Sequence, residues 1–347
     1  MNPNLPGFRR RRGAADFLTP PVAEPSVGRQ RRVRTLLQER TYSLALTIGL
    51  VGVGAALFFP QTFPTFDNWS QVLLNLSIDT IVAVGMMLLL VAGVFDLSVG
   101  SVVAFAGGLA AYGMMTYGWP VPLALGVALG ASAGIGAING YLIAYQGINP
   151  MIQTLAMMGI VRGGALMVSG AGIQNLPYWF NALAQSRLLG VQMPVWYMLL
   201  TVGVFAFLMN KAVFFRRYYY IGGNERAADL SGIRVRRMKL WGFVLTSLLA
   251  GVAGILLASR LGTALPTAGR GLELRVITAV ILGGASLSGG QGKITGALLG
   301  ALFMGLVSNV MVLARVSGYW QEIILGLILI TAVWSDSALR HRLRTRG

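Results

Sequence analysis

Ten stretches of this chain are apolar and almost free of charged residues. Several run for about 17–25 residues, the length that an α-helix needs to cross a hydrocarbon core about 30 Å thick. They are apolar all round and lack the alternation of a transmembrane β-barrel. Since 55% of the 347 residues are apolar and only 11% are charged, no soluble core could bury them. The predicted spans are 43–59, 72–93, 97–117, 121–145, 150–170, 193–210, 240–261, 273–286, 294–313 and 319–335.

The predicted fold class is therefore all-α, a polytopic transmembrane helical bundle of about ten spans. An even number of spans puts both termini on one side of the membrane. With both termini in the cytoplasm, 22 of the 28 Lys and Arg residues fall on the cytoplasmic side, which is the asymmetry that orients multispanning proteins. The net charge of +17 thus reflects topology and contact with anionic lipids. We expect a multi-pass protein of the inner membrane.

Charge divides the chain into three parts. Residues 1–40 form a basic cytoplasmic arm, expected to be flexible, 41–336 form the transmembrane domain with a cytoplasmic loop at 211–239, and 337–347 form a basic cytoplasmic tail. The arm has no interleaved aromatic residues, so its charge is interpreted as a topological determinant and not as a nucleic-acid-binding surface. With no Cys and a single His, His341, the chain is predicted to have no metal site and no catalytic residues.

A weak internal repeat relates residues 93–100 to residues 283–290, at a spacing of 190 residues. Each copy lies between two apolar runs, and the span count puts both copies on the cytoplasmic side. Paired segments interrupted by glycine are where transporters break helices, which frees backbone groups and short polar side chains to line a pathway. The alternative is that these glycines only allow close packing of helices.

The second copy contains the sequence Leu-Ser-Gly-Gly-Gln at 287–291, which looks like the signature peptide of ABC-type ATPases. A nucleotide-binding subunit also needs a phosphate-binding loop with a Gly-Lys-Ser or Gly-Lys-Thr ending, and Lys293 is followed by Ile294. The peptide also lies between apolar runs. We interpret the match as a coincidence, and any ATP hydrolysis is expected from another subunit.

The cytoplasmic loop 211–239 contains a predicted short amphipathic helix. Asn224 is a good N-cap, Glu225 suits the positive end of a helix, and Gly232 can end it. The predicted apolar face consists of Ala227, Leu230 and Ile233. A helix of two turns is marginal alone and needs a partner surface, which is the lipid headgroups, the rest of this chain or a groove on a soluble subunit.

Three segments together resemble the permeases of the ribose, xylose and arabinose class of ABC sugar importers: residues 95–100, 222–233 and 271–292. The resemblance extends from about residue 70 to Asp336. It implies that two such subunits form a channel in the lipid bilayer, that a periplasmic binding protein delivers the sugar, and that separate ATPase subunits carry ATP and Mg, with no cofactor on this chain. It also implies that the loop docks on the ATPase through Asn224, Glu225, Arg226, Ala227, Ala228, Leu230 and Gly232.

The sequence departs from many members of this class at Phe95 and Arg275, and both departures resemble the arabinose branch. Residues 160–163 and 292–294 are similar to that branch as well. L-arabinose is therefore the first substrate that the resemblance implies, among pentoses and related aldoses. A permease of a related ABC importer for branched-chain amino acids or nucleosides is the alternative. An ion-coupled secondary transporter fits less well, because it has no need of a cytoplasmic docking helix.

Polar residues within the spans are the candidates for a sugar pathway, since a sugar is uncharged and is bound best by hydrogen-bonding groups. For the neutral ones, the alternative is an interhelical hydrogen bond that holds the bundle together. The pathway candidates are Asn75, Asp96, Ser98, Asn139, Asn149, Gln153, Ser286, Ser288, Asn309 and Gln321.

Charged residues inside the membrane are expensive unless paired, and Asp79, Asp96, Arg162 and Glu322 are predicted to lie there. An ion pair of Asp96 with Arg162 is one possibility. Near the exterior loop, three arginines are predicted to receive acidic residues of a binding protein, with an internal pair to Glu273 as the alternative. These are Arg260, Arg270 and Arg275.

Overall fold

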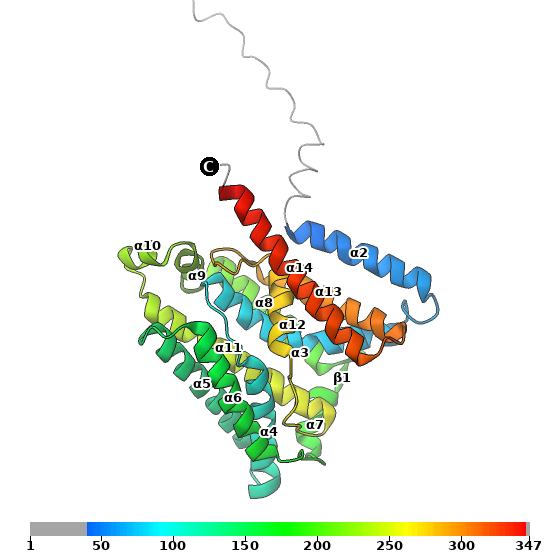
Figure 1. The fold of residues 1–347 in the computed structure, drawn as a ribbon. Helices are drawn as coiled ribbons and strands as arrows, with labels where there is room; N and C mark the ends of the chain where they lie inside the picture. Colours follow the sequence, from blue (N-terminus) through cyan, green and yellow to red (C-terminus); the bar gives the residue numbers. More distant parts are fainter. Residues whose placement is uncertain (1–39, 345–347) are drawn as a thin grey trace, which may run out of the picture. The chain divides into compact units, whose positions relative to one another are not determined.

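The structure, a computed structural model, describes residues 40–344 of the chain, and for 40, 41 and 335–344 it describes the backbone alone. The predicted basic arm up to residue 39 and the side chains of the basic tail lie outside the described residues. The described part is almost entirely helical (Figure 1). Its elements are α2 (Arg40–Phe58), α3 (Phe66–Val91), α4 (Val99–Tyr117), α5 (Val121–Ala144), α6 (Pro150–Ser169), α7 (Tyr178–Gln185), β1 (Arg187–Leu188), β2 (Val191–Gln192), α8 (Met193–Lys211), α9 (Val213–Gly223), α10 (Glu225–Leu230), α11 (Val235–Leu261), α12 (Leu272–Leu282), α13 (Ile294–Leu313) and α14 (Gly318–Arg344).

Seven of these helices are long and apolar enough to cross a membrane: α3, α4, α5, α6, α8, α11 and α13. They coincide with seven of the ten predicted spans, so the chain is a polytopic helical membrane protein. The other three predicted spans fall on shorter apolar helices. In α2 and α14 the apolar parts are Tyr42–Phe58 and Gly318–Trp334.

The third short helix, α12, has 11 residues. At a rise of 1.5 Å per residue it is about 16 Å long, which is about half of the hydrocarbon core. The predicted span 273–286 was therefore too long. The apolar run continues to Ala285, but the helix ends at Leu282 because Gly284, at φ 96°, turns the chain away.

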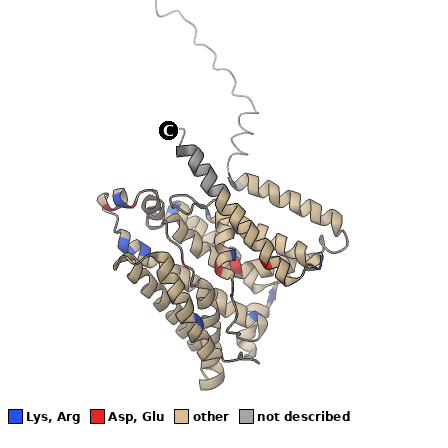
Figure 2. Cartoon of the chain, in the orientation of Figure 1, with Lys and Arg blue, Asp and Glu red and all other residues tan. Residues whose placement is uncertain are grey.

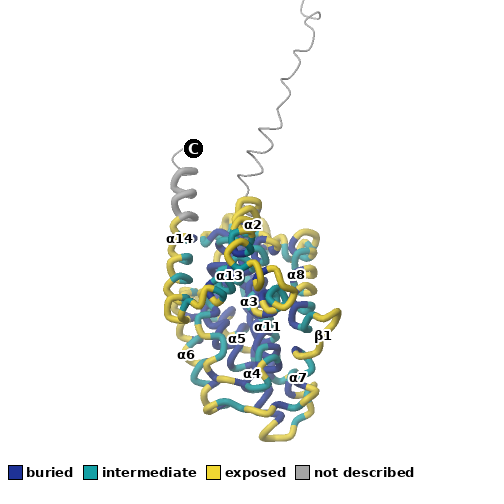
Figure 3. The backbone as a smooth tube through the Cα atoms, turned by 90° about the vertical axis from the view of Figure 1, so that its right-hand side faces the viewer, coloured by how far each residue is buried: buried dark blue, intermediate teal, exposed yellow. Residues whose placement is uncertain are grey.

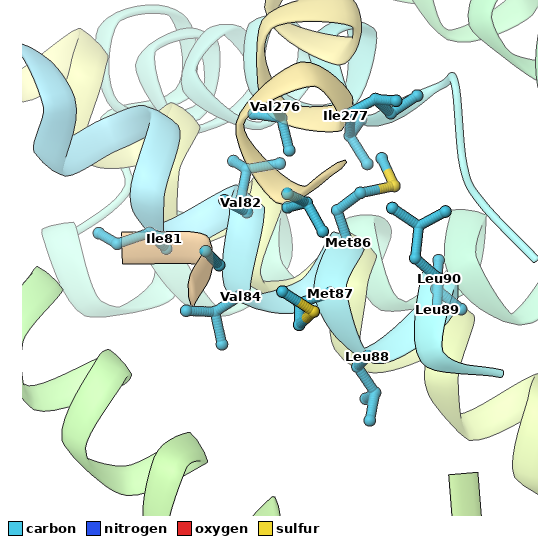
Figure 4. Packing of buried hydrophobic residues seen from close by; sticks show 14 of the residues in the cluster. Ile81, Val82, Val84, Met86, Met87, Leu88, Leu89, Leu90, Val276 and Ile277 are labelled. Carbon is cyan, nitrogen blue, oxygen red and sulfur yellow. The ribbon is translucent and has the colours of Figure 1, made fainter. Parts of the chain in front are cut away.

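Helix α3 lies at the centre of the bundle, and its side chains from Ile81 to Val91 are fully buried. Helices α8, α11, α12 and α13 pack around it. Figure 4 shows Val276 and Ile277 of α12 beside the apolar side chains of α3. A helix that is apolar on all sides can be surrounded by protein in this way. The buried stretches gather in the interior, whereas α2 and α14 are mostly exposed (Figure 3).

Helices α4 and α11 cross closely where glycines face the other backbone. A Cβ atom on Gly254 of α11 would collide with the carbonyl of Val103, and one on Gly107 of α4 would lie 2.8 Å from the carbonyl oxygen of Gly254. Small residues at such crossings let apolar helices gain packing energy without a hydrophobic driving force. Gly107 and Gly254 therefore serve the close packing of α4 against α11.

The helices end on two opposite sides of the bundle. On the side of α9 and α10, the end of α5 packs against the start of α11, where Gly140 contacts Leu240. On the other side, residue Ile173 after α6 pairs with Ala264 after α11. The hairpin of β1 and β2 and the helix α7 lie on that second side, away from α10 (Figure 1). We refer to the two as the α10 side and the hairpin side.

Candidate functional site

A cavity of about 550 Å³ lies among α3, α11, α12 and α13. It is within the size range of small-molecule pockets, about 300–1,000 Å³. It is lined by Asn68 at the start of α3, Arg260 at the end of α11 and Asn309 near the end of α13, so it belongs to the hairpin half of the bundle. Its polar lining residues are Asn68, Gln71, Asn75, Asp79, Arg260, Arg275, Ser308 and Asn309.

The polar groups of the cavity are arranged in three cross-helix pairs. Arg275 Nε donates to Asp79 Oδ2 at 3.1 Å, and Arg260 Nη2 donates to Asn75 Oδ1 at 2.8 Å. The amides of Asn68 and Asn309 exchange two hydrogen bonds, at 3.2 and 2.8 Å. Two guanidinium groups face one carboxylate, so the cavity carries a net positive charge.

The three arginines that were predicted to receive a binding protein are placed differently from one another. Arg260 and Arg275 line the cavity, whereas Arg270 is exposed on the loop before α12. The internal partner of Arg275 is Asp79 and not Glu273, the predicted alternative. A second cavity of about 350 Å³ between α12 and α14 is lined by Arg270 and Glu322 and shares Arg275 with the first.

Four of the predicted pathway residues form a buried network where α4, α5 and α6 meet. Asp96 is fully buried and its carboxylate accepts hydrogen bonds from the backbone N–H of Ser98 at 2.8 Å and from its hydroxyl at 2.6 Å. Asn139 Nδ2 donates to Ser98 Oγ at 3.1 Å, and Gln153 Nε2 donates to Asn139 Oδ1 at 3.2 Å. None of the four lines either cavity. Their contacts are those of an interhelical network.

The ion pair of Asp96 with Arg162 that the sequence suggested does not form. Arg162 Nη1 instead donates to the backbone carbonyls of Pro266 and Ala268, at 2.7 and 2.8 Å. These two bonds fasten the loop between α11 and α12 to α6. The Asp96 carboxylate instead accepts from Ser98 of its own loop and from Asn139 Nδ2 of α5, at 3.5 Å.

The remaining pathway candidates are also placed by the structure. Asn75 and Asn309 line the larger cavity. Asn149 caps α6 by accepting from Met151 N at 2.9 Å, and Gln321 Nε2 donates to Val316 O at 2.9 Å. Ser286 Oγ accepts from Ser288 N at 3.3 Å within the second repeat loop. Sequence reasoning did not single out Asn68, Gln71 and Ser308, because nothing local marks a residue as facing a cavity.

Replacing Asn139 by Leu is expected to destabilise the bundle by about 1–3 kcal/mol, since Gln153 and Ser98 lose a buried partner. Thermal unfolding of the detergent-solubilised chain measures this effect. Gln146→Leu, which replaces an exposed amide, is the control and should leave the unfolding midpoint unchanged. An unfolding midpoint of Asn139→Leu equal to that of the wild type would contradict the role of the network.

The short helix predicted from the loop is confirmed as α10. Asn224 caps it, with Oδ1 accepting from Ala227 N at 3.0 Å. Gly232, at φ 81°, ends the turn that follows, and Glu225 Oε2 accepts from Lys239 Nζ at 2.7 Å. This ion pair ties α10 to the start of α11. The positive charges of α9 and of the start of α11 surround it (Figure 2).

The predicted apolar face of α10 is wrong in part. Ala228 is the buried residue of this helix, whereas Ala227 is exposed and Leu230 is 84% exposed. Ile233 alone of the predicted face packs against the core. Because α10 is attached through Ala228 and through Glu225, its helical face with Leu230 points away from the bundle. The apolar side chain of Leu230 is therefore free to pack against the surface of another molecule.

The chain is thus a helical membrane protein with a polar cavity on the hairpin side and a short exposed helix on the α10 side. The chain belongs to the family described as branched-chain amino acid transport system / permease component, which matches residues 68–333. The resemblance that the sequence motifs indicated is thereby confirmed at the level of permease components.

Relatives in other bacteria resemble the chain over most of its length. The L-arabinose transport system permease protein AraH of Escherichia coli (strain K12) is 40% identical over 88% of this chain and 92% of its own. The L-arabinose ABC transporter permease protein AraH of Azospirillum brasilense is 40% identical over 85% of this chain and 89% of its own length. The ribose import permease protein RbsC of Escherichia coli (strain K12) is 36% identical over 89% and 97%. No solved structure matches the chain.

Proposed function

We propose that this chain is the transmembrane subunit of an ATP-driven, binding-protein-dependent importer of a monosaccharide, with L-arabinose or a related pentose as its substrate. The observation that carries the proposal is the 40% identity to two arabinose permeases over 85–88% of the chain. The polar cavity supports it, because amides, a hydroxyl and a guanidinium–carboxylate pair are groups that bind sugar hydroxyls.

The topology that we propose has ten membrane segments and both termini in the cytoplasm of a bacterial cell, in the inner membrane. α12 and the loop before it form one of the ten segments together. The direction of the chain supports this count, since α3 and α5 both end on the α10 side while α4, α6 and α13 run from there toward the hairpin side. The excess of Lys and Arg around α9–α11 supports a cytoplasmic α10 side (Figure 2).

The partners follow from the class of importer. Separate ATPase subunits carry ATP and Mg and dock on α10, where the contact residues are Asn224, Glu225, Arg226, Ala227, Leu230 and Gly232. Ala228, which the resemblance also implied, is buried against the bundle and makes no such contact. A periplasmic sugar-binding protein docks on the hairpin side, where Arg270 is exposed. A second permease copy completes the channel. This chain itself hydrolyses no ATP and binds no cofactor.

In this proposal the sugar passes through the cavity. There it forms hydrogen bonds with Asn75, Asn309 and the pair of Asp79 and Arg275. The buried residues Asp96, Ser98, Asn139 and Gln153 hold α4, α5 and α6 together beside the pathway.

An amino acid substrate is the second candidate, and one observation favours it. Arg260 has hydrogen-bond partners that are neutral, Asn75 and the carbonyl of Leu74. A guanidinium group without a carboxylate partner in a cavity can bind the carboxylate of a branched-chain amino acid. The description of the family agrees with this reading.

The two candidates are separated by the hydrolysis of ATP in proteoliposomes that contain the chain and its co-purified ATPase. A binding protein loaded with L-arabinose is expected to stimulate hydrolysis, and a binding protein loaded with leucine is expected to have no effect. Stimulation by the leucine-loaded protein alone would replace the sugar by an amino acid. No stimulation by either, nor by binding proteins loaded with ribose or xylose, would contradict the importer itself.

A further inference from the structure

Three segments that are far apart in the sequence meet on the α10 side, backbone against backbone. They are the end of α9 at Gly222, the end of α3 at Val91, and the second repeat loop at Gly289 and Gly290. The N–H of Gly290 donates to the carbonyl of Val91 at 2.8 Å. We call this meeting point of Gly222, Val91, Gly289 and Gly290 the glycine joint.

The glycine joint has no room for a side chain at Gly222. A Cβ atom there would collide with the carbonyl oxygen of Val91 and with the nitrogen of Gly290, and it would lie 3.0 Å from the Cα of Gly289. A Cβ atom on the next residue, Gly223, would meet nothing within 4 Å. Gly289 and Gly290 have φ values of 87° and 76°, which residues other than glycine rarely adopt.

One further hydrogen bond reinforces the joint. The Tyr219 hydroxyl on α9 donates to the carbonyl of Gly292 at 2.8 Å. Tyr219 is partly buried, and burial raises the pKa of its hydroxyl, so the group remains a donor at neutral pH. Helix α9 is thus held to the repeat loop by packing and by a hydrogen bond.

The glycine joint connects α10 with the walls of the cavity. On one side, Gly222 is separated from α10 only by Gly223 and Asn224. On the other side, α3 carries Asp79, and the repeat loop joins α12, which carries Arg275, to α13, which carries Asn309. A movement of α9 and α10 relative to the bundle therefore acts on three of the four helices that line the cavity.

We propose that the glycine joint transmits the movement of α10 to α3, α12 and α13, and that Gly222 is a positioning residue for the coupling of ATP hydrolysis to transport. This inference rests on the proposed function, in which α10 docks on an ATPase. It also gives a role to the Leu-Ser-Gly-Gly-Gln peptide at 287–291: its glycines pack against α9 and do not bind nucleotide. Rigid backbone contact is effective here because it leaves no flexible side chain to absorb the displacement.

The experiment compares Gly222→Ala with Gly223→Ala in proteoliposomes that hold the chain, its ATPase and the arabinose-loaded binding protein. The quantity measured is the number of sugar molecules taken up per ATP hydrolysed. Gly222→Ala is expected to lower this ratio about tenfold while ATP is still hydrolysed, since it separates α9 from the bundle. Gly223→Ala, which meets no neighbour, is expected to keep the ratio of the wild type.

Tyr219→Phe is a second variant, which removes one hydroxyl and adds no bulk. It should lower the ratio about two- to threefold, because only the bond to Gly292 is lost. It decides the question if Gly222→Ala does not assemble with the ATPase. If Gly222→Ala assembles and has the same ratio as the wild type, the coupling role of the glycine joint is wrong, and the proposed function remains intact. If Gly222→Ala does not assemble, a wild-type ratio in Tyr219→Phe leads to the same conclusion. A wild-type complex that takes up no sugar with ATP would instead overturn the proposed function.

Discussion

Leu230→Asp is expected to abolish ATP-driven uptake while the chain remains folded and inserted in the membrane. Leu230 is 84% exposed on α10 and contributes little to the packing of its own chain. If α10 binds an ATPase, this leucine is its apolar contact, and a carboxylate there must lose its hydration without gaining a partner. The cost of several kcal/mol per buried ion lowers the affinity of the ATPase by more than a hundredfold.

Co-purification of the ATPase with the detergent-solubilised chain measures this loss, and uptake into proteoliposomes measures its consequence. Leu230→Met is the matched control, because it keeps an apolar side chain of similar volume and should retain both properties. If Leu230→Asp binds the ATPase and transports like the wild type, then α10 is not the docking helix.

The second large effect is expected from Arg275→Met. It leaves the Asp79 carboxylate in the cavity wall without its partner, which is 3.1 Å away in the wild type. Loss of one member of a buried ion pair costs about 3–5 kcal/mol, and we expect about 1–3 kcal/mol here, since about a third of each side chain is exposed. Sugar uptake by the folded variant should also fall strongly, because the pair of Arg275 and Asp79 lines the cavity.

A double-mutant cycle separates stability from transport in this pair. Asp79→Asn combined with Arg275→Met removes both charges and should restore most of the thermal stability, but not the uptake. Arg187→Met removes an exposed arginine outside the cavity and should change neither quantity. Equal unfolding midpoints for Arg275→Met and the wild type would show that the pair does not stabilise the cavity wall.

The helices of this protein were largely predictable from the sequence. Hydrophobic spans of membrane length have few alternatives, so seven predicted spans coincide with long helices. The cap at Asn224 also gave the start of α10 correctly, because capping is decided within one turn. The end of α12 was missed, since the apolar run continues past Leu282 while Gly284, at φ 96°, turns the chain away from the helix.

The site was much less predictable, because it is made of tertiary contacts. Asn68 and Asn309 exchange hydrogen bonds across 241 positions of sequence, and no spacing rule connects them. For the same reason Arg162 was given the wrong partner. Its hydrogen-bond acceptors are backbone carbonyls, which every residue possesses and which no sequence pattern marks. The outward face of α10 was missed because Ala228, a residue of neutral preference, makes the contact.

The most direct test of this account is uptake of labelled L-arabinose by proteoliposomes that contain the chain and its co-purified ATPase. ATP is enclosed inside the proteoliposomes, on the side of the membrane where the ATPase lies, and the sugar-loaded binding protein is added outside. We predict uptake that requires ATP, the binding protein and an intact α10. Uptake that needs none of these and instead follows an imposed ion gradient would contradict the account, and the chain would then be a secondary transporter.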